Sequence, residues 1–220
     1  MTRLVLFTGM GADRRLTDPV RPAGADFVNP DHLEPEPGEL LPAYAARCAD
    51  AAGLRPGDFV GGVSFGGMVA AEAARQRPVK GLVLLGSTIH PERLPVTYRW
   101  FEHIGPVLPD VLLRVRRWGP FIRTRFGPLS DEGVALLQDM VDVCPPSRIR
   151  AFGRMIVRWR GPSAFACPVL SVHGDRDRVI PPFAAEKGLM LKGAGHCFTL
   201  THAAETVAAL SAFLQPTSAR

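Results

Sequence analysis

Short apolar runs alternate along the chain with stretches whose apolar positions recur every three or four residues. The runs predict buried β-strands, at 4–7, 25–28, 58–63, 80–85, 168–173 and 188–191. The recurring positions predict helices, at 39–52, 65–77 and 201–214. Continuous apolar strands that alternate with helices favour a parallel sheet with helices on both faces. The chain is therefore predicted to form an α/β fold of about six mainly parallel strands, as a single domain over 1–220.

The stretch from about 88 to 162 has a different pattern, because it contains no strand-like run. Helical spacing there predicts four helices, at 92–103, 110–118, 131–143 and 147–159. The N-cap residues predicted for the last three helices are Asp110, Ser130 and Ser147. All three tryptophans of the chain also lie in this stretch. We interpret it as a helical cap, inserted at about 88–162 over the ends of the strands.

Composition is that of an ordinary globular protein, with 46% hydrophobic and 21% charged residues. No apolar run approaches the ~18 residues that a membrane span requires, and the first run is too short for a signal peptide. A cytoplasmic protein without a membrane span is therefore expected. The four cysteines are scattered and show neither metal-ligand nor redox spacing, so no metal and no cofactor are expected.

The formal net charge of +5 comes from the predicted cap, which holds twelve arginines and seven acidic residues, while the rest of the chain is balanced. A basic surface can attract phosphate groups. However, the chain contains no helix-turn-helix, zinc-finger or RNA-binding signature. Arginine also outnumbers lysine throughout the chain, so the preference for arginine is not specific to the predicted cap. No nucleic-acid partner is expected, and the pattern does not determine an oligomeric state or a role for the basic cap.

One predicted strand is followed by the sequence Gly62-Val63-Ser64-Phe65-Gly66, and a predicted helix follows in turn. This G-x-S-x-G pattern is typical of a nucleophile elbow, in which a serine occupies a strained strand-to-helix turn. Glycines on either side allow the strand and the helix to approach closely. The oriented N–H groups at the start of the helix favour a developing negative charge. The alternative interpretation is an ordinary glycine-rich turn.

Three further motifs follow other predicted strands: Thr8-Gly9-Met10-Gly11, His173-Gly174-Asp175-Arg176-Asp177 and Gly193-Ala194-Gly195-His196. With the serine turn, they resemble the α/β-hydrolase superfamily in type and order over nearly the whole chain. The resemblance implies an α/β-hydrolase fold in which serine, aspartate and histidine act together at the strand ends.

The same resemblance assigns roles to five residues. Ser64 would be the nucleophile, His196 the general base and acid, and Asp177 the residue that orients the imidazole. The backbone N–H groups of Met10 and Phe65 would bind the oxyanion of the substrate.

Two positions leave alternatives open. Asp175 competes with Asp177 as the acid of the triad, although the family places its acid three residues after the glycine. Thr8 stands where the family usually has histidine, so the geometry of the loop around Met10 is uncertain from the motif alone.

Three functions are compatible with these motifs. The first is a serine hydrolase that cleaves a small or medium carboxylic ester through an acyl-enzyme. The second is a thioesterase acting on acyl-CoA or on an acyl-carrier protein, for which the basic cap is the motivation. The third is a non-hydrolytic ligand-binding or pathway protein, because receptors of the superfamily can keep the motifs intact.

Overall fold

A six-stranded, entirely parallel sheet forms the centre of the computed structural model, which describes residues 1–96, 98, 105, 108–110, 119–162, 164–182 and 188–215. The strand order is β2-β1-β3-β4-β5-β6. The strands are β1 (Arg3–Phe7), β2 (Asp26–Val28), β3 (Phe59–Val63), β4 (Gly81–Leu85), β5 (Val169–Gly174) and β6 (Leu189–Leu191). Each lies where an apolar run predicted it, and the predicted α/β fold with six parallel strands is confirmed.

The burial of the strands follows their place in the sheet. Every residue of β3 and β4 is buried, because these central strands have neighbours on both sides and helices over both faces. The outermost strands, β2 and β6, are only three residues long and are partly exposed. The central strands therefore form the rigid frame from which the neighbouring turns extend.

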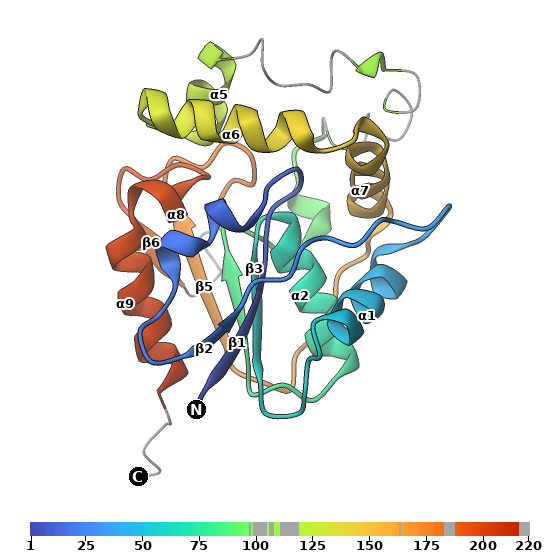
Figure 1. The fold of residues 1–220 in the computed structure, drawn as a ribbon, viewed down its shortest axis with the longest axis vertical. Helices are drawn as coiled ribbons and strands as arrows, with labels where there is room; N and C mark the ends of the chain where they lie inside the picture. Colours follow the sequence, from blue (N-terminus) through green and yellow to red (C-terminus); the bar gives the residue numbers. More distant parts are fainter. Residues whose placement is uncertain are drawn as a thin grey trace.

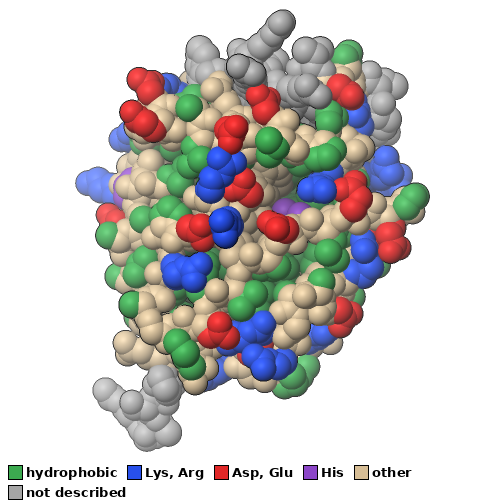
Figure 2. All heavy atoms as spheres, viewed as in Figure 1, with side chains coloured by type: hydrophobic (Ala, Val, Ile, Leu, Met, Phe, Trp, Pro, Cys, Tyr) green, Lys and Arg blue, Asp and Glu red, His purple; other side chains and the backbone are tan. Residues whose placement is uncertain are grey.

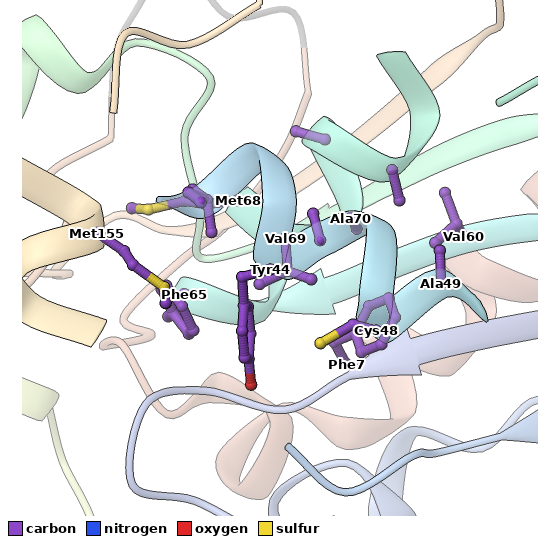
Figure 3. Close-up of a cluster of buried hydrophobic side chains, with 14 of the residues drawn as sticks. Phe7, Tyr44, Cys48, Ala49, Val60, Phe65, Met68, Val69, Ala70 and Met155 are labelled. Carbon is purple, nitrogen blue, oxygen red and sulfur yellow. The ribbon is translucent and has the colours of Figure 1, made fainter. Parts of the chain in front are cut away.

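Helices cover both faces of the sheet (Figure 1). The first face carries α1 (Leu41–Ala51) and α2 (Phe65–Gln76), and the second carries α8 (Phe198–Thr201) and α9 (Ala203–Leu214). Figure 3 shows part of the apolar core under α1 and α2, where Tyr44, Phe65 and Met68 pack together. The helix predicted at 201–214 is α9, which begins at Ala203, and the short helix α8 precedes it before the turn at His202.

In its described part, the chain between β4 and β5, called here the β4–β5 segment, places three α-helices beyond the carboxyl ends of the strands (Figure 1). They are α5 (Gly119–Phe126), α6 (Asp131–Val143) and α7 (Pro146–Arg158). The side chain of Ser130 accepts a hydrogen bond from the Gly133 N–H, as expected of an N-cap.

The prediction is wrong at two places in this segment. Helix α7 begins at Pro146 with Pro145 at the N-cap, so Ser147 is inside the first turn, because proline fits that turn without losing a hydrogen bond. Helix α5 was not predicted, because a Gly-Pro pair normally marks a break; here that pair starts the helix. The predicted helices 92–103 and 110–118, with the Asp110 cap, lie largely outside the described residues.

The β4–β5 segment joins the body of the protein through apolar contacts and a buried hydrogen bond. Phe152, Met155 and Ile156 of α7 belong to the same apolar cluster as α1 and α2. After α7, the indole N–H of Trp159 donates to Oε1 of the buried Glu72 of α2, at 2.8 Å.

Across the described part of the chain, no helix combines the length and apolarity needed to cross a bilayer.

Candidate active site

Ser64 occupies the turn between β3 and α2 with φ 53° and ψ −120°. Among the described residues it is the only non-glycine residue with a positive φ. Its N–H donates to the carbonyl of Leu85 at 2.9 Å. Its carbonyl accepts from the Gly67 N–H at 3.0 Å and from the Ser87 hydroxyl at 2.7 Å. Strained backbone persists only where surrounding contacts hold it, and these three hydrogen bonds do so here.

The glycines around Ser64 are needed for close backbone contacts. A Cβ on Gly62 would lie far closer than 3.0 Å to the backbone of Gly66, because strand and helix touch at this turn. A Cβ on Gly66 would meet the carbonyl oxygen of Thr8 in the same way. The alternative of an ordinary glycine-rich turn does not explain why both flanking positions exclude a side chain while the serine between them is strained.

Asp177 and His196 lie side by side, although 19 residues separate them in the chain. Oδ2 of Asp177 is 2.7 Å from Nδ1 of His196, and both residues are buried. The other carboxylate oxygen accepts from the backbone N–H groups of Val179 and Ile180, at 2.8 and 2.9 Å. This arrangement leaves Nε2 of His196 as the ring nitrogen available to a substrate or a nucleophile.

The carboxyl group of Asp177 stays ionised despite its burial. Burial alone would raise its pKa, but the positive potential of His196 and hydrogen bonds with His173 and His196 outweigh that effect. The pKa of Asp177 is therefore held well below its usual range. An ionised carboxylate in this position favours the Nδ1–H tautomer of His196.

His173 is a second histidine beside Asp177 that the motifs did not assign. Its Nε2 lies 3.2 Å from Oδ2 of Asp177 and 2.7 Å from the carbonyl of Ile180. The competing acid, Asp175, is exposed and accepts from the Gly193 N–H at 2.7 Å. The hydrogen bond with His196 thus goes to Asp177 and not to Asp175.

The loop after β1 lies directly against Ser64. A Cβ on Gly9 would be 3.6 Å from Cβ of Ser64, which is ordinary contact distance. The loop is held by two hydrogen bonds of Thr8: its hydroxyl donates to the carbonyl of Ala12 at 3.1 Å, and its own carbonyl lies 3.0 Å from Nε2 of His32. His32 is a residue that the motifs missed, because it comes from a loop with no glycine-flanked strand end.

The Phe65 ring stacks on the Phe152 ring at 4.6 Å between ring centroids. Its backbone N–H is at the first position of α2, where a helix offers no internal acceptor. Because a phenyl ring carries no hydrogen-bond donor, Phe65 can offer only this backbone N–H to a negatively charged oxygen.

A cavity of about 170 Å³ brings these groups together. Ser64, His196, Met10 and Phe65 all line it. Its remaining wall includes the loop after β1, helices α2, α5, α6 and α7, Tyr98 and the turn after β5, mostly as apolar side chains. None of the described residues that line it is Lys, Arg, Asp or Glu. In the described part of the chain, no group of three or more His, Cys, Asp or Glu side chains could hold a metal ion.

A model of the alpha/beta hydrolase family matches residues 4–210. The chain belongs to this family. Among solved structures, this alpha/beta hydrolase is similar to a thermophilic esterase from Thermogutta terrifontis, with a TM-score of 0.77 and 22% identity over 97% of this chain and 89% of that one. An esterase from Exiguobacterium antarcticum has a TM-score of 0.78 and 13% identity, covering 98% of this chain and 92% of its own. At these identities the likeness shows a shared fold.

A bromoperoxidase from Bacillus anthracis is also similar in fold, with a TM-score of 0.74 and 18% identity over 98% of this chain and 92% of that one. One curated relative, the orsellinic acid synthase armB of Armillaria mellea, is 42% identical over 78 residues. That match covers 31% of this chain and only 4% of the length of the synthase.

Proposed function

We propose that this alpha/beta hydrolase is a serine hydrolase that cleaves a carboxylic ester. Ser64 is the nucleophile, His196 the general base and acid, and Asp177 the residue that orients the imidazole. The observation that carries the proposal is that His196, held by a 2.7 Å hydrogen bond with Asp177, lines the same cavity as the strained Ser64. Family membership supports hydrolysis as the class of reaction.

The chemistry follows from these positions. Oγ of Ser64 attacks the ester carbonyl while Nε2 of His196 takes the hydroxyl proton. The negative charge that develops on the carbonyl oxygen is bound by the N–H groups of Phe65 and Met10. The C–O bond of the ester then breaks, and His196 returns the proton to the departing alcohol. Water repeats the sequence on the acyl-enzyme and releases the carboxylic acid.

The substrate that fits this cavity has an uncharged, apolar group next to its reacting carbonyl. A charged group would lose its hydration without gaining a partner, because the described lining residues carry no fixed charge. Side chains of α5, α6 and α7 form part of the wall, which supports the β4–β5 segment as a cap over the site, at about 88–162. Small to medium acyl esters are therefore the proposed substrates.

The direct test combines a fluorophosphonate probe with a chain-length series of chromogenic esters. Wild type is expected to label and to turn over, with the highest kcat/KM on uncharged apolar acyl groups. Ser64→Ala is expected to lose both labelling and turnover. Ser211→Ala, a serine of α9 that does not line the cavity, is the matched control and should behave as wild type. Labelling that survives Ser64→Ala would refute the proposal.

The thioesterase alternative rests on the charge of the β4–β5 segment, in which three of the described arginines form ion pairs with carboxylates. Arg148 pairs with Glu34 at 2.6 Å, Arg150 with Asp110 at 2.6 Å, and Arg123 with Asp131. Basic and acidic side chains are also interspersed on the face shown in Figure 2. A matched ester and acyl-CoA thioester in the same assay separate the two activities. Tight ligand binding without turnover of either would favour the non-hydrolytic alternative.

A further inference from the structure

The end of α5 touches the turn that carries His196. The ring of Phe126, the last residue of α5, lies 5.8 Å from the His196 ring between centroids, in an edge-on arrangement at 66°. The carbonyl of the same residue accepts a hydrogen bond from the Cys197 N–H at 3.2 Å. One residue of the β4–β5 segment thus contacts both the imidazole and the backbone beside it.

Next to these contacts, the two backbones meet through a pair of glycines. A Cβ on Gly127 would lie 2.5 Å from Cα of Gly195, and a Cβ on Gly195 would lie closer than 3.0 Å to the backbone of Phe126 and Gly127. Contacts this short are not tolerated between real side chains and backbone. Any side chain at either glycine must therefore push the histidine turn away from α5.

We propose that Phe126 and Gly127 are positioning residues for His196, so that the β4–β5 segment sets the orientation of the general base as well as forming a wall of the cavity. This inference rests on the proposed function. Asp177 holds one ring nitrogen of His196, and this single hydrogen bond by itself does not prevent rotation of the ring about it. The edge-on ring of Phe126 limits the rotation, and the hydrogen bond from Cys197 fixes the backbone of the turn. A base displaced by about 1 Å can lose on the order of a hundredfold in rate.

The test pairs Gly127→Ala with Gly193→Ala. Both glycines have a positive φ, +107° and +80°, so both substitutions carry the same kind of backbone penalty. Nothing lies within 4 Å of a Cβ at Gly193, whereas at Gly127 it collides with the histidine turn. With an apolar chromogenic ester, Gly127→Ala is expected to lower kcat by roughly a hundredfold. Gly193→Ala, in the histidine turn itself, is expected to stay within about threefold of wild type, because it causes no collision.

Phe126→Leu is the milder second variant, because it removes the ring and keeps both apolar bulk and the backbone carbonyl. It is expected to lower kcat by about tenfold with KM nearly unchanged, since the loss is one of orientation and not of substrate affinity. Phe126→Tyr keeps the ring and is expected to restore most of kcat. If Phe126 had a purely structural role, Phe126→Leu would lower the thermal midpoint. It would not lower kcat selectively over KM, and Phe126→Tyr would not restore kcat selectively.

The outcomes separate the inference from the proposed function. If wild type neither turns over esters nor reacts with a fluorophosphonate, the proposed function fails and the inference fails with it. If wild type is active but Phe126→Leu changes only KM, Phe126 is a substrate wall and the inference is overturned. It is also overturned if Gly127→Ala and Gly193→Ala have equal kcat. If Gly127→Ala does not fold, kcat and KM of Phe126→Leu decide whether the inference holds.

Discussion

The two halves of the candidate site are held in place in different ways. The serine turn is fixed by the backbone of adjoining elements: β3 and α2 carry it, β4 and the loop after β1 pack against it, and the glycines at 62 and 66 allow that contact. The histidine turn has its close backbone contacts elsewhere, with Gly174 at the end of β5 and with Gly127 just after α5. It is held by Asp177 from the turn after β5 and by Phe126 from α5. Ser64 is thus positioned by the centre of the sheet, and His196 by the end of β5 together with the β4–β5 segment.

The largest effect is expected on the histidine side, from Asp177→Asn. An asparagine removes the charge that stabilises the imidazolium and favours the wrong tautomer, so kcat is expected to fall by about 10⁴-fold. Asp175→Asn is the matched control two residues away, because Asp175 is exposed and bonds only Gly193 in the described contacts. Steady-state kinetics of both variants check this. Equal losses of kcat in Asp177→Asn and Asp175→Asn would show that the turn after β5 contributes only to folding.

On the serine side, Gly66→Ala is expected to reduce stability as well as activity. The new Cβ must overlap the carbonyl oxygen of Thr8, so the turn has to open, at an expected cost of about 3–5 kcal/mol of unfolding free energy. Gly133→Ala, in the first turn of α6, would place its Cβ 3.3 Å from the end of the Leu129 side chain, which has to shift only slightly. This variant is therefore expected to change stability by less than ~1 kcal/mol. Urea unfolding measures both. A urea midpoint of Gly66→Ala equal to that of wild type would contradict the close contact between Gly66 and Thr8.

Acid is expected to loosen the loop beside the serine before it affects the histidine side. Burial lowers the pKa of His32 from 6.5 to about 4, against the hydrogen bond with the Thr8 carbonyl. Between these two pH values, His32 binds a proton in the unfolded chain but stays neutral in the folded protein. Stability is therefore lost as the pH falls from about 6.5 to about 4, by at most ~1.4 kcal/mol per pH unit.

The lowered pKa of Asp177 acts in a separate range, because stability from that carboxylate is lost only as the pH falls below its unfolded value of about 3.8. Urea unfolding at a series of pH values resolves the two ranges. His32→Gln can still donate to Thr8 but does not titrate, so it is expected to flatten the upper range alone. An unchanged slope in that variant would assign the acid sensitivity to another group.

The smallest effect is expected from the exposed ion pairs between the β4–β5 segment and the body of the protein. Arg148 pairs with Glu34, and Arg15 pairs with Asp139 at 2.7 Å. Exposed pairs of this kind contribute about 0.2–1 kcal/mol and are screened by salt. Arg148→Met is therefore expected to shift the urea midpoint slightly and to leave kcat unchanged. A tenfold loss of kcat would mean that the segment is held by charge and not by its apolar contacts.

The sequence alone was sufficient for the sheet, for the serine turn and for the order of the motifs. Apolar runs and helical spacing are local properties, and a strand-to-helix turn with glycines on both sides is a local requirement. For the same reason the helix 131–143 and its Ser130 cap were predicted correctly. Local patterns were insufficient at α5, where a glycine and a proline start a helix, and at Pro146, where a proline and not Ser147 begins one.

Only the tertiary structure decided which side chains meet at the strand ends. The choice of Asp177 over Asp175, the contact of His173 with that carboxylate, the place of His32 behind the loop and the edge-on ring of Phe126 all join residues from separate elements. No local period along the chain encodes such pairs. They depend on how far the turns extend beyond the sheet and on which helices pack over it, because burial of apolar surface sets those positions for the whole fold at once.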